Sequence, residues 1–401
     1  MTKHSLLSLA AAAALVLTGC GGGGSTPTTS TNTNTTTPAE EDSATIAPVK
    51  QADALKTTIN ATGATNVTGA DNTGSPVAPE KRKTVRGNIA EDTNWTNDTT
   101  WVLDGLVVVK SGATLTIDAG TTIAGKDGTG AATSYLIVEA GAKIMAKGTS
   151  TEPIVFTSEK AVDGKAEAVG QWGGVTIIGK ATNDQVQPYE VNEKYKSVDV
   201  ADSVANDNSG VLKHIKVLNS GITMQQDKEI NGLSFIAVGS GTTIEDITVE
   251  RSDDDCIEIW GGTVNLSNIT TRECTDDQFD IDDGFSGTVT NLDIKQVATN
   301  SGNAAIEMSG DTAATFDGVY IDQEASAKEG GIFFKKDGIG GHFKNVTVKS
   351  ATDNKYGAIN SKGVYDADNT TFDNVVLEGA NEYKITGDKQ DTIDGLRGWF
   401  K

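Results

Sequence analysis

The side chains that could do chemistry in this sequence are concentrated in two short acidic segments. Residues 254–259 read Asp-Asp-Cys-Ile-Glu-Ile, and residues 276–281 read Asp-Asp-Gln-Phe-Asp-Ile. A shift of 22 residues superimposes three carboxylates of one segment on three of the other. The resulting pairs are Asp254 with Asp276, Asp255 with Asp277 and Glu258 with Asp280, and Glu307 continues the last of these columns.

Carboxylates stacked in this way need a counter-charge. At a separation of about 5 Å they cannot all stay ionised, so either their pKa values rise or a cation bridges them. Ca²⁺ suits such a group because it accepts about 6 to 8 oxygen ligands in irregular geometry. Asp282 and Asp283 are close enough in sequence to add ligands. Three interpretations stay open: a Ca²⁺ site formed by the six paired residues, a solvated acidic face whose Asp side chains bind turn amides, and catalysis.

An enzymatic interpretation rests on a short resemblance. Residues 254–257, Asp-Asp-Cys-Ile, resemble a segment of the polygalacturonases, in which paired carboxylates flank the glycosidic bond. The Gly-His-Gly and Arg-Ile-Lys segments of that family do not follow. A lyase would need Ca²⁺ and a basic residue near the acidic segments. At an offset of 22 residues, however, Arg251 faces Glu273 and Arg272 faces Glu250, so ion pairs account for both arginines. We expect no catalytic residue, with a Ca²⁺-dependent polysaccharide lyase or glycoside hydrolase as the alternative.

Two cysteines and a tryptophan flank the acidic segments. Cys256 and Cys274 fall on adjacent coils, and the spacing leaves open a disulfide, which requires a sharp bend at residues 253–254, or two buried thiols. Trp260 is the best candidate among the five tryptophans for stacking on a sugar. The alternative is a Trp that covers the edge or end of a coil.

The elements that must position these residues are strands that recur at coil-like intervals. A pattern of apolar, any, polar or Gly, apolar, any, apolar occurs seven times. Its third positions are His214, Asp246, Asn268, Asn291, Gly318, Asn345 and Asn374. Asn, Asp and Gly tolerate the left-handed conformation that a sharp bend needs. Stacked Asn side chains can also hydrogen-bond along the column.

A second, shorter strand follows several of these copies by 13 to 17 residues, as at residues 257–259 and 279–281. Alternation places the first and third side chains of each inside and the middle one outside. No segment after the N-terminal apolar run has a sustained helical period. The sequence therefore predicts an all-β chain with a single right-handed parallel β-helix over residues 83–401, of about twelve to fourteen coils and about 60 Å long. A β-sandwich, which would need tight hairpins, is the alternative.

The N-terminus indicates export. An apolar run over residues 6–17 is too short to remain in a bilayer and is typical of a secretory signal. It ends in Leu17-Thr18-Gly19-Cys20, which resembles the lipobox of bacterial lipoproteins. The resemblance implies a signal peptide over residues 1–19 and lipidation of Cys20, and Gly21 in place of Asp favours the outer membrane. An ordinary signal with a chance Cys is the alternative.

Residues 20–82 and the net charge limit the partners. The segment that follows Cys20 is rich in Gly, Ser and Thr and carries few large apolar side chains, so we expect a flexible linker in preference to a small domain. The formal net charge is −22, from 55 acidic and 33 basic residues. Such a surface repels nucleic acid and favours cations.

Several longer segments resemble a family of bacterial surface lipoproteins with a pectin-lyase-like β-helix. They are residues 170–179, 207–213, 229–234, 239–245, 254–264 and 276–284. The family has no established activity, so the resemblance implies fold and location only. We expect a lipid anchor in the outer membrane, facing the periplasm or the cell surface, and an acidic β-helix that serves as a binding or structural module for glycans, cations or surface components.

Overall fold

The computed structural model describes residues 81–182, 194–225, 228–297, 302–324, 328–336, 339–350, 356–362, 366, 368–379, 385–387, 394 and 396. These residues all belong to one compact unit within Ala44–Lys401. The expected signal peptide, Cys20 and residues 20–80 of the expected linker lie outside them. Within these ranges, no helix has the length and apolar character needed to cross a membrane.

Most of the described chain forms one sheet of 23 strands. In chain order the strands are β1 (Arg82–Ile89), β2 (Thr93–Trp95), β3 (Thr100–Val109), β4 (Thr114–Ile117), β5 (Thr122–Gly125), β6 (Tyr135–Val138), β7 (Lys143–Lys147), β8 (Ile154–Ser158), β9 (Val175–Ile178), β10 (Gly210–Ser220), β13 (Leu233–Ile236), β14 (Thr243–Ser252), β15 (Ile257–Trp260), β16 (Asn265–Arg272), β17 (Phe279–Asp282), β18 (Thr288–Gln296), β19 (Ala304–Met308), β20 (Ala313–Gln323), β21 (Gly330–Phe334), β22 (Gly340–Ser350), β23 (Ile359–Ser361), β24 (Thr370–Gly379) and β25 (Ile385–Gly387). A separate antiparallel hairpin joins β11 (Ile222–Gln225) to β12 (Lys228–Ile230). The short helices are η1 (Gly130–Ala132), α2 (Glu159–Val162) and η2 (Val200–Asp202).

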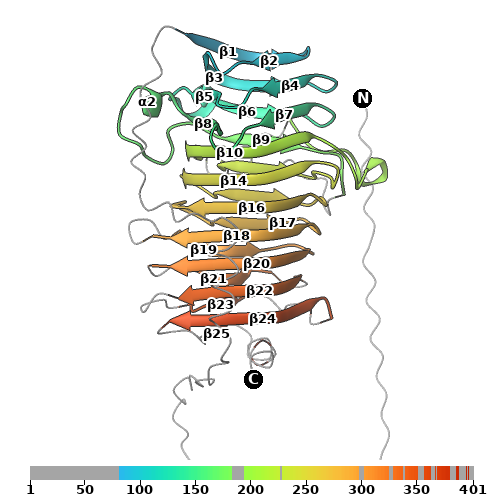
Figure 1. The fold of residues 1–401 in the computed structure, drawn as a ribbon. Helices are drawn as coiled ribbons and strands as arrows, with labels where there is room; N and C mark the ends of the chain where they lie inside the picture. Colours follow the sequence, from blue (N-terminus) through green and yellow to red (C-terminus); the bar gives the residue numbers. More distant parts are fainter. Residues whose placement is uncertain are drawn as a thin grey trace, which may run out of the picture. The chain divides into compact units, whose positions relative to one another are not determined.

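Within the 23-stranded sheet the strands of successive coils pair in parallel, so the chain is a right-handed parallel β-helix, as predicted (Figure 1). One row of paired strands, here called the short-strand row, runs β1, β3, β6, β9, β13, β15, β17, β19, β21, β23, β25. It has eleven rungs among the described residues, against the twelve to fourteen coils expected for residues 83–401. At about 4.8 Å a rung, the row is about 50 Å long.

The long strands from β10 to β24 form a second row and bend at the positions predicted from the repeat. All seven third-position residues have positive φ, from 49° at His214 to 77° at Gly318. The amides also bond along the column, as predicted. Asn268 donates to Asp246 over 2.9 Å, and Asn291 donates to Asn268 over 3.0 Å. We call the third-position residues the amide ladder.

The core lies inside the coils, because alternation turns every second apolar side chain inward. Phe316, Phe343 and Phe372 stack face to face in successive coils, with ring centroids 5.3 and 5.1 Å apart. A second apolar cluster lies on the outer surface of the short-strand row, where Ile222 and Ile230 of the hairpin pack with Ile178 and Trp260.

Candidate functional site

The predicted register of the acidic segments is confirmed. In the short-strand row, Glu258 of β15 lies opposite Asp280 of β17, and Asp280 lies opposite Glu307 of β19. These three middle residues point outward, as alternation requires. They form what we call the outer column. The row places Ser234 before the column and Phe333 after it, so the acidic stretch is three rungs long.

A second column forms at the turns that precede β13, β15 and β17. Its members are Asn231, Asp255 and Asp277, and we call it the turn column. The Asp255 amide donates to Asn231 Oδ1 over 3.2 Å, the Asp277 amide donates to Asp255 Oδ1 over 2.7 Å, and the Ala304 amide donates to Asp277 Oδ1 over 2.5 Å. One oxygen of each aspartate therefore satisfies a backbone amide of the next coil. This is the turn-amide role foreseen for part of the acidic segments.

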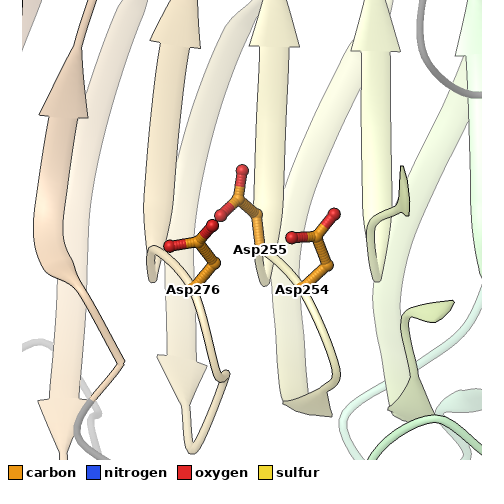
Figure 2. A group of neighbouring side chains, drawn as sticks. All are labelled: Asp254, Asp255 and Asp276. Atoms are coloured by element: carbon orange, nitrogen blue, oxygen red, sulfur yellow. The ribbon is translucent and has the colours of Figure 1, made fainter. Parts of the chain in front are cut away.

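The two columns bring carboxylates together in small groups. Asp254, Asp255 and Asp276 each offer an oxygen within 4.8 Å of the others, and so do Asp255, Glu258 and Asp280. Figure 2 shows the first group, with Asp254 and Asp276 on either side of Asp255. Asp255 belongs to both groups. The two groups hold five of the six residues predicted as metal ligands, and the sixth, Asp277, lies in a third group with Glu307 and Glu329.

The second group is buried and incompletely satisfied. The exposed fractions of Asp255, Glu258 and Asp280 are 6%, 7% and 8%. Asp280 Oδ1 is buried and has no hydrogen-bond partner. A buried carboxylate oxygen that accepts no hydrogen bond loses its hydration without compensation. A proton or a cation would supply that compensation.

The pKa values of these groups report the same shortage of positive charge. Burial raises the pKa of Asp255 well above its ordinary value, and the carboxylates of Asp254 and Asp277 raise it further. Burial also raises the pKa of Asp280 well above its ordinary value, and the carboxylate of Glu307 is the next largest cause. Burial raises the pKa of Glu307 to about 7, although Lys335 opposes the shift.

Lys335 contacts the outer column, although no motif in the sequence predicts it there. It follows β21, and its Nζ donates to Glu307 Oε1. The Glu307 side chain is 1% exposed, whereas that of Lys335 is 45% exposed, so the ammonium group reaches the column from the solvent side. The signal in the sequence was weak, because Lys335 lies two residues beyond Phe333, the rung partner of Glu307.

Cys256 and Cys274 form a disulfide in the structure, with Cα atoms 5.5 Å apart. Of the two states that the sequence left open, the structure therefore has the bonded one. Both residues are fully buried. Cys256 follows Asp255, and Cys274 precedes Asp276 by two residues. The bond thus joins the two turns that carry the candidate ligands.

Trp260 is poorly placed for a sugar. The residue is 6% exposed and packs in the second apolar cluster with Ile178, Ile236 and Ala237. A stacked sugar needs an open ring face, which this burial does not leave. The alternative stated from the sequence, a Trp that covers part of a coil, fits this position.

The two arginines near the site are engaged in ion pairs. Arg251 lies 3.8 Å from Glu273, as expected, and also 2.6 Å from Glu167. Arg272 lies opposite Glu250 in register, but its recorded ion pair, at 3.8 Å, is with Asp293. Glu250, the predicted partner of Arg272, is therefore its register neighbour on β14, whereas the ion pair is formed with Asp293.

The chain matches the family model described as "Pectate-lyase like beta helix domain" over residues 87–393. It therefore belongs to this family, in agreement with the fold expected from the repeat. The comparison with curated protein sequences gave no match. Among solved structures, the Dettilon tailspike protein is similar at 10% identity and a TM-score of 0.20. That match covers 70% of this chain and 62% of the tailspike chain, so this chain spans less than two thirds of the tailspike.

Proposed function

We propose that this protein is an exported, lipid-anchored β-helix that binds a divalent cation, Ca²⁺ in preference, on its outer and turn columns, and that serves as a binding or structural module at the cell surface. The observation that carries the cation site is Asp280 Oδ1, which is buried without a partner among carboxylates within 4.8 Å. Carboxylate oxygens are the ligands that Ca²⁺ takes, and the irregular arrangement of this group fits its flexible coordination.

The expected ligands are those of the second group, Asp255, Glu258 and Asp280, and the first group adds Asp254 and Asp276 through the shared Asp255. A bound cation would neutralise buried charge and join β15 to β17, the two coils that contribute the ligands. Because only the folded chain assembles this group, binding would stabilise the fold by mass action. An acidic face that holds Ca²⁺ could also bridge to anionic glycans or surface components through the cation.

Calorimetric unfolding tests the cation site. Millimolar Ca²⁺ should raise the melting temperature of the protein above its value in chelator. The variant Asp255→Asn with Asp277→Asn should lose most of this rise, because the amides keep the oxygen acceptors of the turn column but lose the charge. The control is Glu91→Gln with Asp311→Asn, which removes two charges at exposed positions. Equal melting temperatures of the wild type in Ca²⁺ and in chelator would contradict the proposal.

Lipidation and catalysis are tested separately. Replacing Cys20 with Ala should move the protein from the detergent phase to the aqueous phase, and unchanged partition would contradict the anchor. Incubation with polygalacturonate and Ca²⁺ should give neither new reducing ends nor the ultraviolet absorption of an unsaturated product. Turnover that Asp255→Ala abolishes would instead establish the enzymatic alternative.

A further inference from the structure

We propose that Lys335 is an intrinsic counter-cation that confines the divalent cation to the Asp255–Glu258–Asp280 end of the columns and weakens its binding there. The inference rests on the proposed function and names the residue that sets the affinity of the site. It assigns a role to a side chain that contributes no ligand.

The geometry places one fixed positive charge at one end of the acidic stretch. The outer column ends at Glu307, and its next rung is the aromatic side chain of Phe333. Lys335 emerges beyond Phe333 and reaches back one coil to Glu307, to which its Nζ donates a hydrogen bond. Glu307 also belongs to a third group of carboxylates, with Asp277 and Glu329, whose oxygens lie within 4.8 Å of one another. An ammonium group is thus bonded to a member of this third group.

The charge of Lys335 acts beyond Glu307. It opposes the rise in the pKa values of Asp276 and Asp280, in which burial is the largest cause. In return, burial lowers the pKa of Lys335, but this effect is outweighed by the carboxylates of Glu307, Asp280 and Asp277, which raise it. Lys335 therefore stays protonated, and a divalent cation at Asp280 would experience its repulsion. Charges that are buried, or partly so, are screened only weakly by salt.

The opposite end of the columns is where an external cation fits. Asp280 is the rung neighbour of both Glu258 and Glu307, and its Oδ1 has no partner even though Lys335 is bonded one rung away. The ammonium group therefore compensates Glu307 and leaves part of Asp280 unsatisfied. The carboxylates divide into a group that has an internal cation and a group that needs an external one.

The test measures Ca²⁺ affinity by isothermal titration on the full chain carrying Cys20→Ala, alone and with substitutions at Lys335. Lys335→Met should lower the Kd about tenfold, because a repelling unit charge is removed from beside the cation. Lys335→Arg should leave the Kd within about twofold of the parent, since the charge remains. Lys349→Met is the matched control, because Lys349 is similarly exposed, at 48%, and ion-paired, but with Asp322 on another row of strands.

A double variant separates charge from structure. Lys335→Met with Glu307→Gln removes the ion pair as a unit, so its Kd should return to near the parent value. If Lys335 merely held the coil in place, Lys335→Met would weaken binding. That result, or a Kd equal to that of Lys349→Met, overturns the inference and leaves the proposed function standing. Binding by Lys335→Met alone, with none by the parent, supports the inference and overturns the proposed function. No binding by either protein overturns both.

Discussion

The amide ladder and the outer column are built in the same way but reach opposite electrostatic outcomes. In both, a parallel β-helix places a residue of one coil beside the equivalent residue of the next. An amide carries a donor and an acceptor, so Asn291 donates to Asn268 and Asn268 donates to Asp246. A carboxylate offers acceptors only, so Asp280 next to Glu258 and Glu307 leaves an oxygen unpaired.

The difference teaches that a stacked column is self-sufficient only if its side chain complements itself. The ladder residues Asn268 and Asn291 are exposed and remain satisfied without any ligand. The outer column is buried and acquires compensation from outside its own side chains: Lys335 donates to Glu307, the Asn231 amide donates to Glu258 and, we propose, a cation completes the site at Asp280. The outer column is therefore the part of the solenoid that can respond to its surroundings.

The largest expected effect concerns the disulfide that joins the two acidic turns. Cys256→Ala with Cys274→Ala should lower the free energy of unfolding by about 3 kcal/mol, because the bond closes a loop with a sequence separation of 18 residues. Urea unfolding of oxidised wild type and the variant measures the loss. The wild type unfolded with reductant should match the variant. A loss below about 1 kcal/mol in the variant and in the reduced wild type would show that packing alone holds the acidic coils together.

A smaller effect is expected from pH in chelator. Burial raises the pKa of Glu307 to about 7 in the folded state, against about 4.3 in an unfolded chain. The folded state therefore binds this proton more tightly, so its contribution to stability is greatest at low pH and is lost as pH rises from about 4 to about 7. Unfolding at pH 8 should require about 2 kcal/mol less than at pH 5.

Glu307→Gln should reduce this dependence, because one of the buried titrating carboxyl groups is removed. Urea unfolding at several pH values provides the comparison. The asparagines of the amide ladder predict no such dependence between pH 5 and 8, since amides do not titrate. Stability that rises with pH over this interval in the wild type would contradict the account of the buried carboxylates.

The smallest effect is expected from a substitution that gives the amide ladder the carboxylate chemistry of the outer column. Asn268→Asp should lower the free energy of unfolding by about 1 kcal/mol at pH 8, because it replaces the donor to Asp246 with a second carboxylate. The site is exposed, so the loss should shrink in high salt. Asn268→Gly, which keeps the positive φ but loses the amide, is the control. Equal stability of Asn268→Asp and wild type at low salt would show that self-complementarity does not matter there.

Much of the fold follows from the sequence because the repeat is local and regular. The bend residues and the register of Glu258 on Asp280 depend only on the spacing of short motifs, and both are confirmed. The number of coils was harder to predict: the connection that carries α2 and the hairpin of β11 and β12 occupy chain length without adding a rung to the part of the chain that the structure describes.

The site was less predictable where it depends on long connections. Lys335 reaches Glu307 from beyond its strand, and Asn231 meets Asp255 across a 24-residue interval that contains a different loop. The apolar cluster that contains Trp260 also draws on segments distant in sequence, among them Tyr195 and Ile222. Motif spacing alone carries no information about such contacts, because loop paths set them.

The central claim is that Asp280 belongs to a cation site, and its most direct test is the effect of Ca²⁺ on the unfolding free energy of Asp280→Asn. In chelator the variant should be more stable than wild type by about 1 kcal/mol, because an amide can donate to its carboxylate neighbours and carries no buried charge. In millimolar Ca²⁺ the order should reverse, since wild type gains a ligand and the variant does not. The same order of stability in both solutions would contradict the account.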